Sequence, residues 1–155
     1  MSFPLPHELL PHRYPFLLLD RVTQHPPGAL RAIKCVTYNE PYFVGHFPSS
    51  PIVPGVILIE IMAQASAALY RLEHPSETLP MPGKLAAVDR ARFHVPVYPG
   101  TQLIVNTKLV QAIGALARFE ATISMDDTLV ASAVLTLVSP VGKLPSDSEF
   151  VRCIT

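Results

Sequence analysis

Residues 54–72, PGVILIEIMAQASAALYRL, form the densest apolar stretch of the chain. Pro54 and Gly55 are typical of a helix start, and a His-Pro pair just after the stretch marks its end. The residues between, 56–72, are apolar on nearly every side, and as an α-helix they would span about 26 Å. Because a helix without a polar face is buried, this segment predicts a long central helix that the rest of the fold encloses.

Segments that resemble β-strands flank this helix, two before it and four after it. Short turns rich in Pro, Gly and Asp separate them, and the last three follow one another so closely that they should form an antiparallel meander. A sheet of about six strands that packs on one helix must curl around it. We therefore expect an α+β fold in which a curved antiparallel sheet wraps around the central helix, the hotdog arrangement. The segments cover residues 16–25, 29–38, 84–93, 102–113, 115–125 and 128–138.

Length and composition narrow the possible classes of protein. The chain has 155 residues and a mass of 17.0 kDa, which predicts one domain over residues 1–155. Apolar residues make up 49% and charged residues 15%, so much of the surface should be buried in a core or a subunit interface. Twelve basic residues balance twelve acidic ones. This balance argues against a nucleic-acid-binding protein.

The same sequence indicates a cytoplasmic protein without a metal or cofactor. Its two cysteines, Cys35 and Cys153, are too few for a disulfide framework, and we expect Cys153 to be an exposed thiol. The first ten residues lack the long apolar run of a secretory signal, and polar residues interrupt the central helix too often for membrane insertion. No zinc-binding, serine-hydrolase or glycine-rich phosphate motif is present.

The central helix nevertheless carries a carboxyl group, that of Glu60. Gln64 lies four residues further on and shares its helix face. Burial of a carboxyl group favours its protonated form, which suits a general acid, and Gln64 could orient it. The alternatives are a carboxylate that faces water or pairs with an arginine.

A candidate base and a candidate oxyanion site precede this acid. His46 lies in the proline-rich loop that enters the helix, and histidine titrates near neutral pH. The alternative is a histidine that only bonds to the local backbone. Gly55 stands at the helix start, where free N–H groups favour a developing negative charge. The remaining histidines have no comparable setting: His7, His12, His25, His74 and His94.

Several ordered motifs then point to a known family. Over roughly residues 9–140 the chain resembles the FabZ-type (3R)-hydroxyacyl-acyl-carrier-protein dehydratases. The stretches that carry the resemblance are LPHRYPFLLLDRV at 10–22, NEPYF at 39–43, GHFP at 45–48, PGV at 54–56 with Glu60 and Gln64 after it, and ARF at 91–93 with PV at 96–97 and PG at 99–100.

This resemblance implies a hotdog fold and a homodimer in which His46 of one subunit meets Glu60 of the other; such dimers often assemble into hexamers as trimers of dimers. It implies that His46 removes the proton α to the thioester carbonyl, the Gly55 N–H holds the carbonyl oxygen and Glu60 protonates the departing hydroxyl. Phe47, Pro54 and Gln64 would support these residues. The related dehydratase-isomerases similar to FabA have Asp in place of Glu60, so dehydration without isomerisation is expected.

The chain also departs from the family pattern. Ser49-Ser50 stand where the family commonly has Gly followed by Arg or Lys, and His94-Val95 replace the usual basic pair after ARF. Both changes lower the positive charge of the surface on which family members meet acyl carrier protein. Lys84, Arg90 and Arg92 remain as candidate contacts with the carrier, and the alternative is a solvated sheet edge. These departures lead to the hypothesis of a specialised pathway, such as polyene or other lipid-like chain assembly, instead of housekeeping fatty acid synthesis.

Two other functions remain open at this point. One is a hotdog acyl-thioester hydrolase, which would use a carboxylate and a helix-start oxyanion site to release a free thiol. The other is a non-catalytic acyl-binding subunit, against which the presence of both His46 and Glu60 argues. The tail after Pro140 has no role that the sequence assigns.

Overall fold

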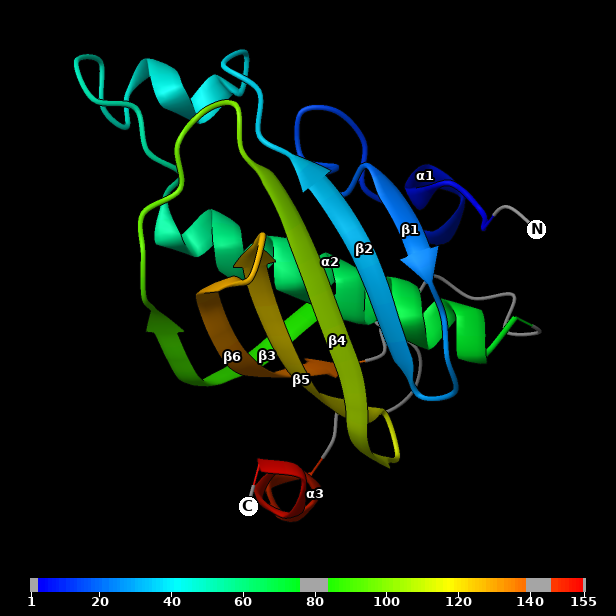
Figure 1. Ribbon diagram of the computed structural model, residues 1–155. Coiled ribbons are helices and arrows are strands. Elements are labelled where there is room, and N and C mark those ends of the chain that lie inside the picture. Colours follow the sequence, from blue (N-terminus) through cyan, green and yellow to red (C-terminus); the bar gives the residue numbers. More distant parts are fainter. Residues whose placement is uncertain (1–2, 76–83, 139–145, 155) are drawn as a thin grey trace.

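The computed structural model describes residues 3–75, 84–138 and 146–154. One six-stranded antiparallel sheet lies against one long helix, α2, which runs from Gly55 to Glu73 (Figure 1). The strand order is β1-β2-β4-β5-β6-β3, so β1 and β3 are the two edges. The strands are β1 (Arg21–Gln24), β2 (Ala29–Cys35), β3 (Lys84–Phe93), β4 (Gln102–Ile113), β5 (Leu116–Met125) and β6 (Thr128–Val138). This architecture confirms the predicted hotdog fold and the meander of its last three strands.

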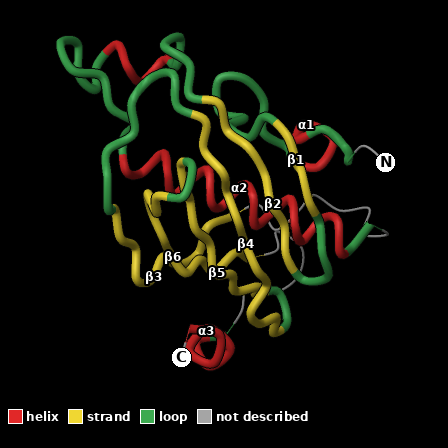
Figure 2. Tube along the Cα trace, in the orientation of Figure 1, coloured by secondary structure: helices red, strands yellow, loops and turns green. Residues whose placement is uncertain are grey.

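The core lies between α2 and the sheet that curves across it (Figure 2). Every residue of α2 from 61 to 69 is buried, which confirms the prediction of a central helix. Ile61 and Leu69 pack in the same core as Phe119 of β5. A buried hydrogen bond of 2.8 Å between the hydroxyls of Ser66 and Thr107 ties α2 to β4. Burial of these nine residues therefore fixes the position of α2 against the sheet.

The first predicted strand is shorter than the sequence pattern indicated. We expected residues 16–25 in a strand, but β1 covers only Arg21–Gln24. The backbone of the preceding residues finds other partners: the Leu18 N–H donates to Gln64 of α2, and the Phe16 carbonyl accepts from the same amide. Because a side chain satisfies these groups, no neighbouring strand is required there.

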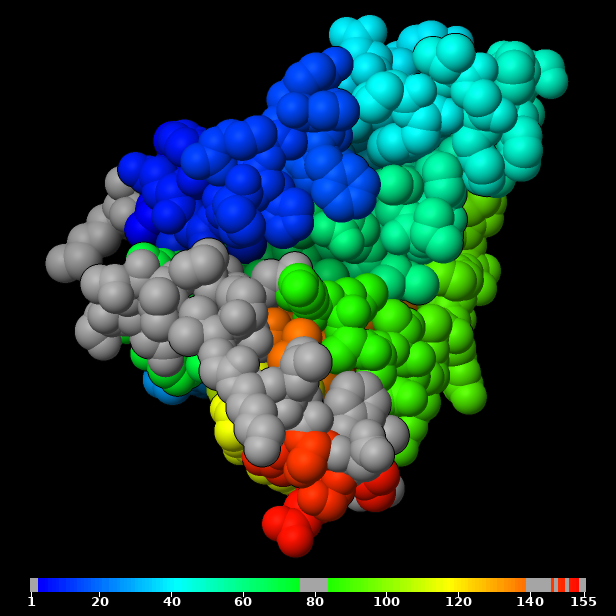
Figure 3. Space-filling view, turned by 180° about the vertical axis from the view of Figure 1, so that it is seen from behind, coloured from blue at the N-terminus to red at the C-terminus, as the bar shows by residue number. Residues whose placement is uncertain are grey.

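One edge of the sheet is left open. No residue of β3 is buried, although Leu85, Val88 and Phe93 are large apolar side chains. Figure 3 shows a strip of α2 at the surface between the N-terminal segment, the loop before the helix and β3. An apolar edge strand beside an exposed helix strip is typical of a surface that another chain covers.

The chain ends in a short helix, α3, from Asp147 to Ile154, which lies beside β4 and β5. Cys153 is fully buried there, so the prediction of an exposed thiol is wrong. Arg118 of β5 ties α3 to the sheet, because its guanidinium donates to the Cys153 carbonyl at 3.1 Å and also pairs with Asp89 at 3.2 Å. Burial raises the pKa of the Cys153 thiol.

By length and composition, α2 would also suit a membrane span. Of its most apolar window, 56% is buried inside the fold, as in the core helix of a soluble protein. This burial makes α2 the central element of the folded core.

Candidate active site

The loop between β2 and α2 carries the predicted base. It begins with the 3-10 helix η1 (Pro41–Val44), and a buried ion pair between Lys34 and Glu40 anchors it to β2. The His46 N–H donates to the Tyr42 carbonyl at 2.9 Å, which fixes the backbone of His46. The site of His46 is therefore set by bonds within the loop, in addition to its prolines.

The ring of His46 has a defined hydrogen-bond partner. Its Nδ1 lies 2.9 Å from the carbonyl oxygen of Ile52. A carbonyl can only accept, so Nδ1 carries the proton and, in the neutral ring, Nε2 has the free lone pair. The ring of Phe47 stacks on that of His46 at a centroid distance of 4.1 Å. This arrangement leaves Nε2 as the atom that can accept a proton.

The predicted acid lies on α2 and is held by a side-chain amide. Gln64 is 1% exposed, and its Nε2 donates to Glu60 Oε1 at 2.9 Å and to the Phe16 carbonyl at 2.7 Å. Its Oε1 accepts from the Leu18 N–H at 2.9 Å. Because the backbone N–H can only donate, the orientation of the Gln64 amide is fixed. The prediction that Gln64 shares a face with Glu60 is confirmed, and its orienting role stays a prediction.

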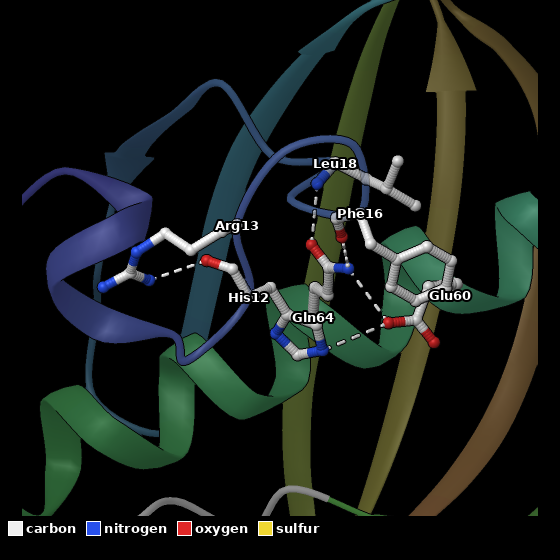
Figure 4. Close-up of polar contacts among 6 residues, drawn as sticks. All are labelled: His12, Arg13, Phe16, Leu18, Glu60 and Gln64. Carbon is white, nitrogen blue, oxygen red and sulfur yellow. Dashed lines mark hydrogen bonds and ion pairs between the residues drawn. The ribbon is translucent and has the colours of Figure 1, made fainter. Parts of the chain in front are cut away.

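A histidine that sequence reasoning had set aside completes this cluster. His12 Nε2 lies 3.5 Å from Glu60 Oε1, and Figure 4 shows both side chains converging with Gln64. The interpretation that His12 has no setting comparable to that of His46 is therefore wrong. His12 lies 48 residues before Glu60, so helix spacing could not reveal the contact; its only signal was its place in the LPHRYPF motif.

The start of α2 borders an open cavity. Gly55, Leu58, Phe93 and Val97 are among the residues that line a space of about 340 Å³. A Cβ atom at Gly55 would lie 3.1 Å from the Phe93 ring, so this position requires glycine or a shift of Phe93. The Gly55 N–H has no acceptor among the described residues. Pro54 precedes it as the helix N-cap.

Within the described chain, the structure does not join the two predicted catalytic side chains. No hydrogen bond or ion pair links His46 to Glu60 in residues 3–75, 84–138 and 146–154. The cavity beside Glu60 measures only about 30 Å³, which is room for about one water molecule. An acyl chain therefore needs space outside this cavity.

The three predicted carrier contacts do not form one patch. All are exposed on β3, but Lys84 stands at its first residue, roughly 25 Å along the strand from Arg92. Arg90 and Arg92 line a depression of about 450 Å³ on the sheet with Glu120. Any shared surface must therefore be built on Arg90 and Arg92.

Comparison with known proteins identifies the family. The model for the FabA-like domain matches residues 10–134. The chain is 42% identical over 150 residues to the 3-hydroxyacyl-[acyl-carrier-protein] dehydratase FabZ of Yersinia pestis (strain Pestoides F), covering 94% of this chain and 83% of that protein. The chain belongs to the FabZ dehydratase family. The FabZ protein of Yersinia pseudotuberculosis serotype O:1b gives the same identity and coverage.

Solved structures agree with the fold of a FabZ-family chain. The dehydratase heterocomplex ApeI:P from Xenorhabdus doucetiae aligns with a TM-score of 0.77 at 22% identity and covers 99% of each chain. Thioesterase superfamily member 2 from Mus musculus aligns with a TM-score of 0.57 at 13% identity, over 76% of this chain and 79% of that one. At these identities, the likeness concerns the hotdog fold alone.

Proposed function

We propose that this chain removes water from (3R)-3-hydroxyacyl thioesters on acyl carrier protein and forms trans-2-enoyl thioesters. Membership of the FabZ dehydratase family supports the reaction type. The observation that carries the proposal is the combination of a histidine whose Nε2 is left as an acceptor and a carboxyl group held by a buried amide. These are the base and the acid that a β-elimination requires.

The proposed reaction assigns one proton to each side chain. His46 Nε2 takes the proton from C2 of the acyl chain, and the electron pair moves toward the thioester oxygen. The free Gly55 N–H, at the positive end of α2, stabilises that oxygen. The C3–O bond then breaks, Glu60 gives its proton to the leaving hydroxyl, and water departs. Proton return from His46 to Glu60 through solvent restores the starting state.

We propose that the active unit is a homodimer formed along β3, with His46 and Glu60 of each site supplied by different subunits. Three observations support it: no hydrogen bond or ion pair joins His46 to Glu60 in the described chain, the space beside Glu60 holds about one water, and β3 is an exposed edge with large apolar side chains. A second copy would cover that edge and complete the site. Hexamer formation and a cytoplasmic location stay predictions.

We propose acyl carrier protein as the partner, with Arg90 and Arg92 as its contacts. Carrier proteins are acidic, and Arg90 and Arg92 line a depression on the face of the sheet, where their two positive charges outnumber the one carboxylate of Glu120. Ser49 and Ser50 are exposed and neutral, which keeps the specialised-pathway hypothesis open. Turnover on housekeeping and pathway-specific carriers tests it, and equal preference for the housekeeping carrier removes its basis.

The test is a spectrophotometric assay on a 3-hydroxyacyl thioester that follows the conjugated enoyl product while free thiol is monitored in parallel. We expect Glu60→Gln and His46→Gln each to lower kcat by about 10²–10⁴. Glu73→Gln and His74→Gln are matched controls, because Glu73 lies on the same helix and His74 also bonds a backbone carbonyl through Nδ1. Both controls should keep the wild-type rate.

The other outcomes assign other functions. Thiol release without enoyl product would indicate a thioesterase, and acyl binding without either product would indicate a non-catalytic subunit. Undiminished dehydration in folded Glu60→Gln would refute the assigned acid.

A further inference from the structure

His12 is held in place from its own segment as well as from α2. The segment follows the short helix α1 (Pro6–Leu9), and the Arg13 guanidinium donates to the carbonyls of Leu10 and His12 at 2.9 and 2.7 Å. Figure 4 shows Arg13 pointing away from Glu60 while the His12 ring points toward it. The backbone of His12 is thus fixed, and its ring is the part that faces the carboxyl group.

The surroundings of the His12 ring select one of its tautomers. Nδ1 is buried and has no hydrogen-bond partner among the described residues. A proton on Nδ1 would create a buried N–H donor without an acceptor. An unprotonated Nδ1 without a donor costs less free energy. The neutral ring with its proton on Nε2 is therefore favoured. Nε2 lies on the side of the ring that faces Glu60, 3.5 Å from its Oε1.

Two N–H groups consequently converge on one oxygen of Glu60. The Gln64 amide donates to Oε1, and His12 Nε2 lies 3.5 Å from the same atom. Oε2 has no hydrogen bond or ion pair within the part of the chain that the structure describes. A carboxylic acid proton on Oε1 would face these two N–H groups, so the protonated form carries its proton on Oε2.

We propose that His12 is a positioning residue for Glu60: its Nε2–H, together with Gln64, occupies Oε1 and so places the acid proton on Oε2, the oxygen left for the substrate hydroxyl. This inference rests on the proposed function, because it assigns a role to His12 only if Glu60 is the acid. His12 itself does not touch the reacting atoms. Its contribution is to fix the direction from which the proton is delivered.

The test compares two amides that differ in reach. The side-chain nitrogen of Gln falls near the position of Nε2, whereas that of Asn falls near Nδ1. We expect His12→Asn to lower kcat of the full-length protein about 10–100-fold with KM changed less than threefold. His12→Gln should restore kcat to within about fivefold of wild type. Because the two variants differ by one methylene group, thermal unfolding and size-exclusion chromatography should show matched stability and assembly.

Two results would overturn the inference. One is a wild-type kcat in His12→Asn, and the other is an equal loss in His12→Asn and His12→Gln when both are folded. His12→Phe, which keeps the ring but lacks the donor, should behave like His12→Asn. Glu60→Gln, assayed beside them, separates the two proposals: if it is inactive while His12→Asn is active, only the role of His12 fails. If Glu60→Gln is fully active, the proposed function fails.

Discussion

Replacing Gln64 by Leu should destabilise the fold by an amount that the structure sets. Leucine has nearly the same volume, but it leaves the buried Leu18 N–H and the half-buried Phe16 carbonyl without their partner. A buried donor without an acceptor costs about 1–3 kcal/mol of stability. The cost for a carbonyl that water can reach lies near the lower end of this range. We therefore expect the free energy of unfolding to fall by about 2–4 kcal/mol, which lowers Tm by roughly 4–16 °C in a chain of this length.

Urea unfolding followed by circular dichroism measures this change, with both proteins at the same protomer concentration because assembly adds to stability. The matched control is Gln111→Leu on β4, where the glutamine is exposed and the change should stay within about 0.5 kcal/mol. If Gln64→Leu shows no greater loss than Gln111→Leu, the Gln64 amide does not hold the N-terminal segment on α2.

Three further predictions concern stability and reactivity. Hydrogen bonds from the Gly28 N–H, the larger cause, and from His25 lower the pKa of Glu73. Glu73→Gln should therefore lower the free energy of unfolding by at most about 0.5 kcal/mol at neutral pH. In urea titrations this loss should vanish as the pH falls through and below roughly 4. Burial should make Cys153 react with a thiol reagent at pH 8 much more slowly than the exposed cysteine, giving two kinetic phases in Ellman's assay. Glu40→Gln should destabilise the fold by about 3–5 kcal/mol in thermal unfolding, because it leaves Lys34 buried without its partner, and the double replacement Lys34→Met/Glu40→Leu should cost less.

The sequence predicted those elements whose signals are local. The helix over residues 56–72 matches α2 within one residue at each end. Its ends were predictable because a Pro-Gly pair precedes the apolar stretch and a His-Pro pair follows it. Three strands, at 84–93, 102–113 and 128–138, match in full, since turn residues bound them. The helix α3 was not predicted, because its eight residues are fewer than a helical period needs to be recognised.

The failures come from contacts between distant residues. Residues 16–20 have the composition of a strand, but the amide of Gln64, more than forty residues away, takes their backbone bonds. The contact between His12 and Glu60 also crosses this distance. Periodicity and spacing describe neighbours along the chain and cannot reveal such pairs. The catalytic roles of His46 and Glu60 stay predictions, because no hydrogen bond or ion pair joins the two side chains within the described residues.

The proposed base and the proposed acid are positioned by different kinds of partner. The Nδ1 of His46 meets a backbone carbonyl, that of Ile52, which no side-chain substitution removes. Glu60 Oε1 meets two side chains, Gln64 and His12, either of which one substitution can delete. The tautomer of the base should thus persist in almost any variant that keeps the loop folded. The direction of proton delivery by the acid depends on side chains 4 and 48 residues away in the sequence. Substitutions can therefore change the geometry of the acid more easily than that of the base.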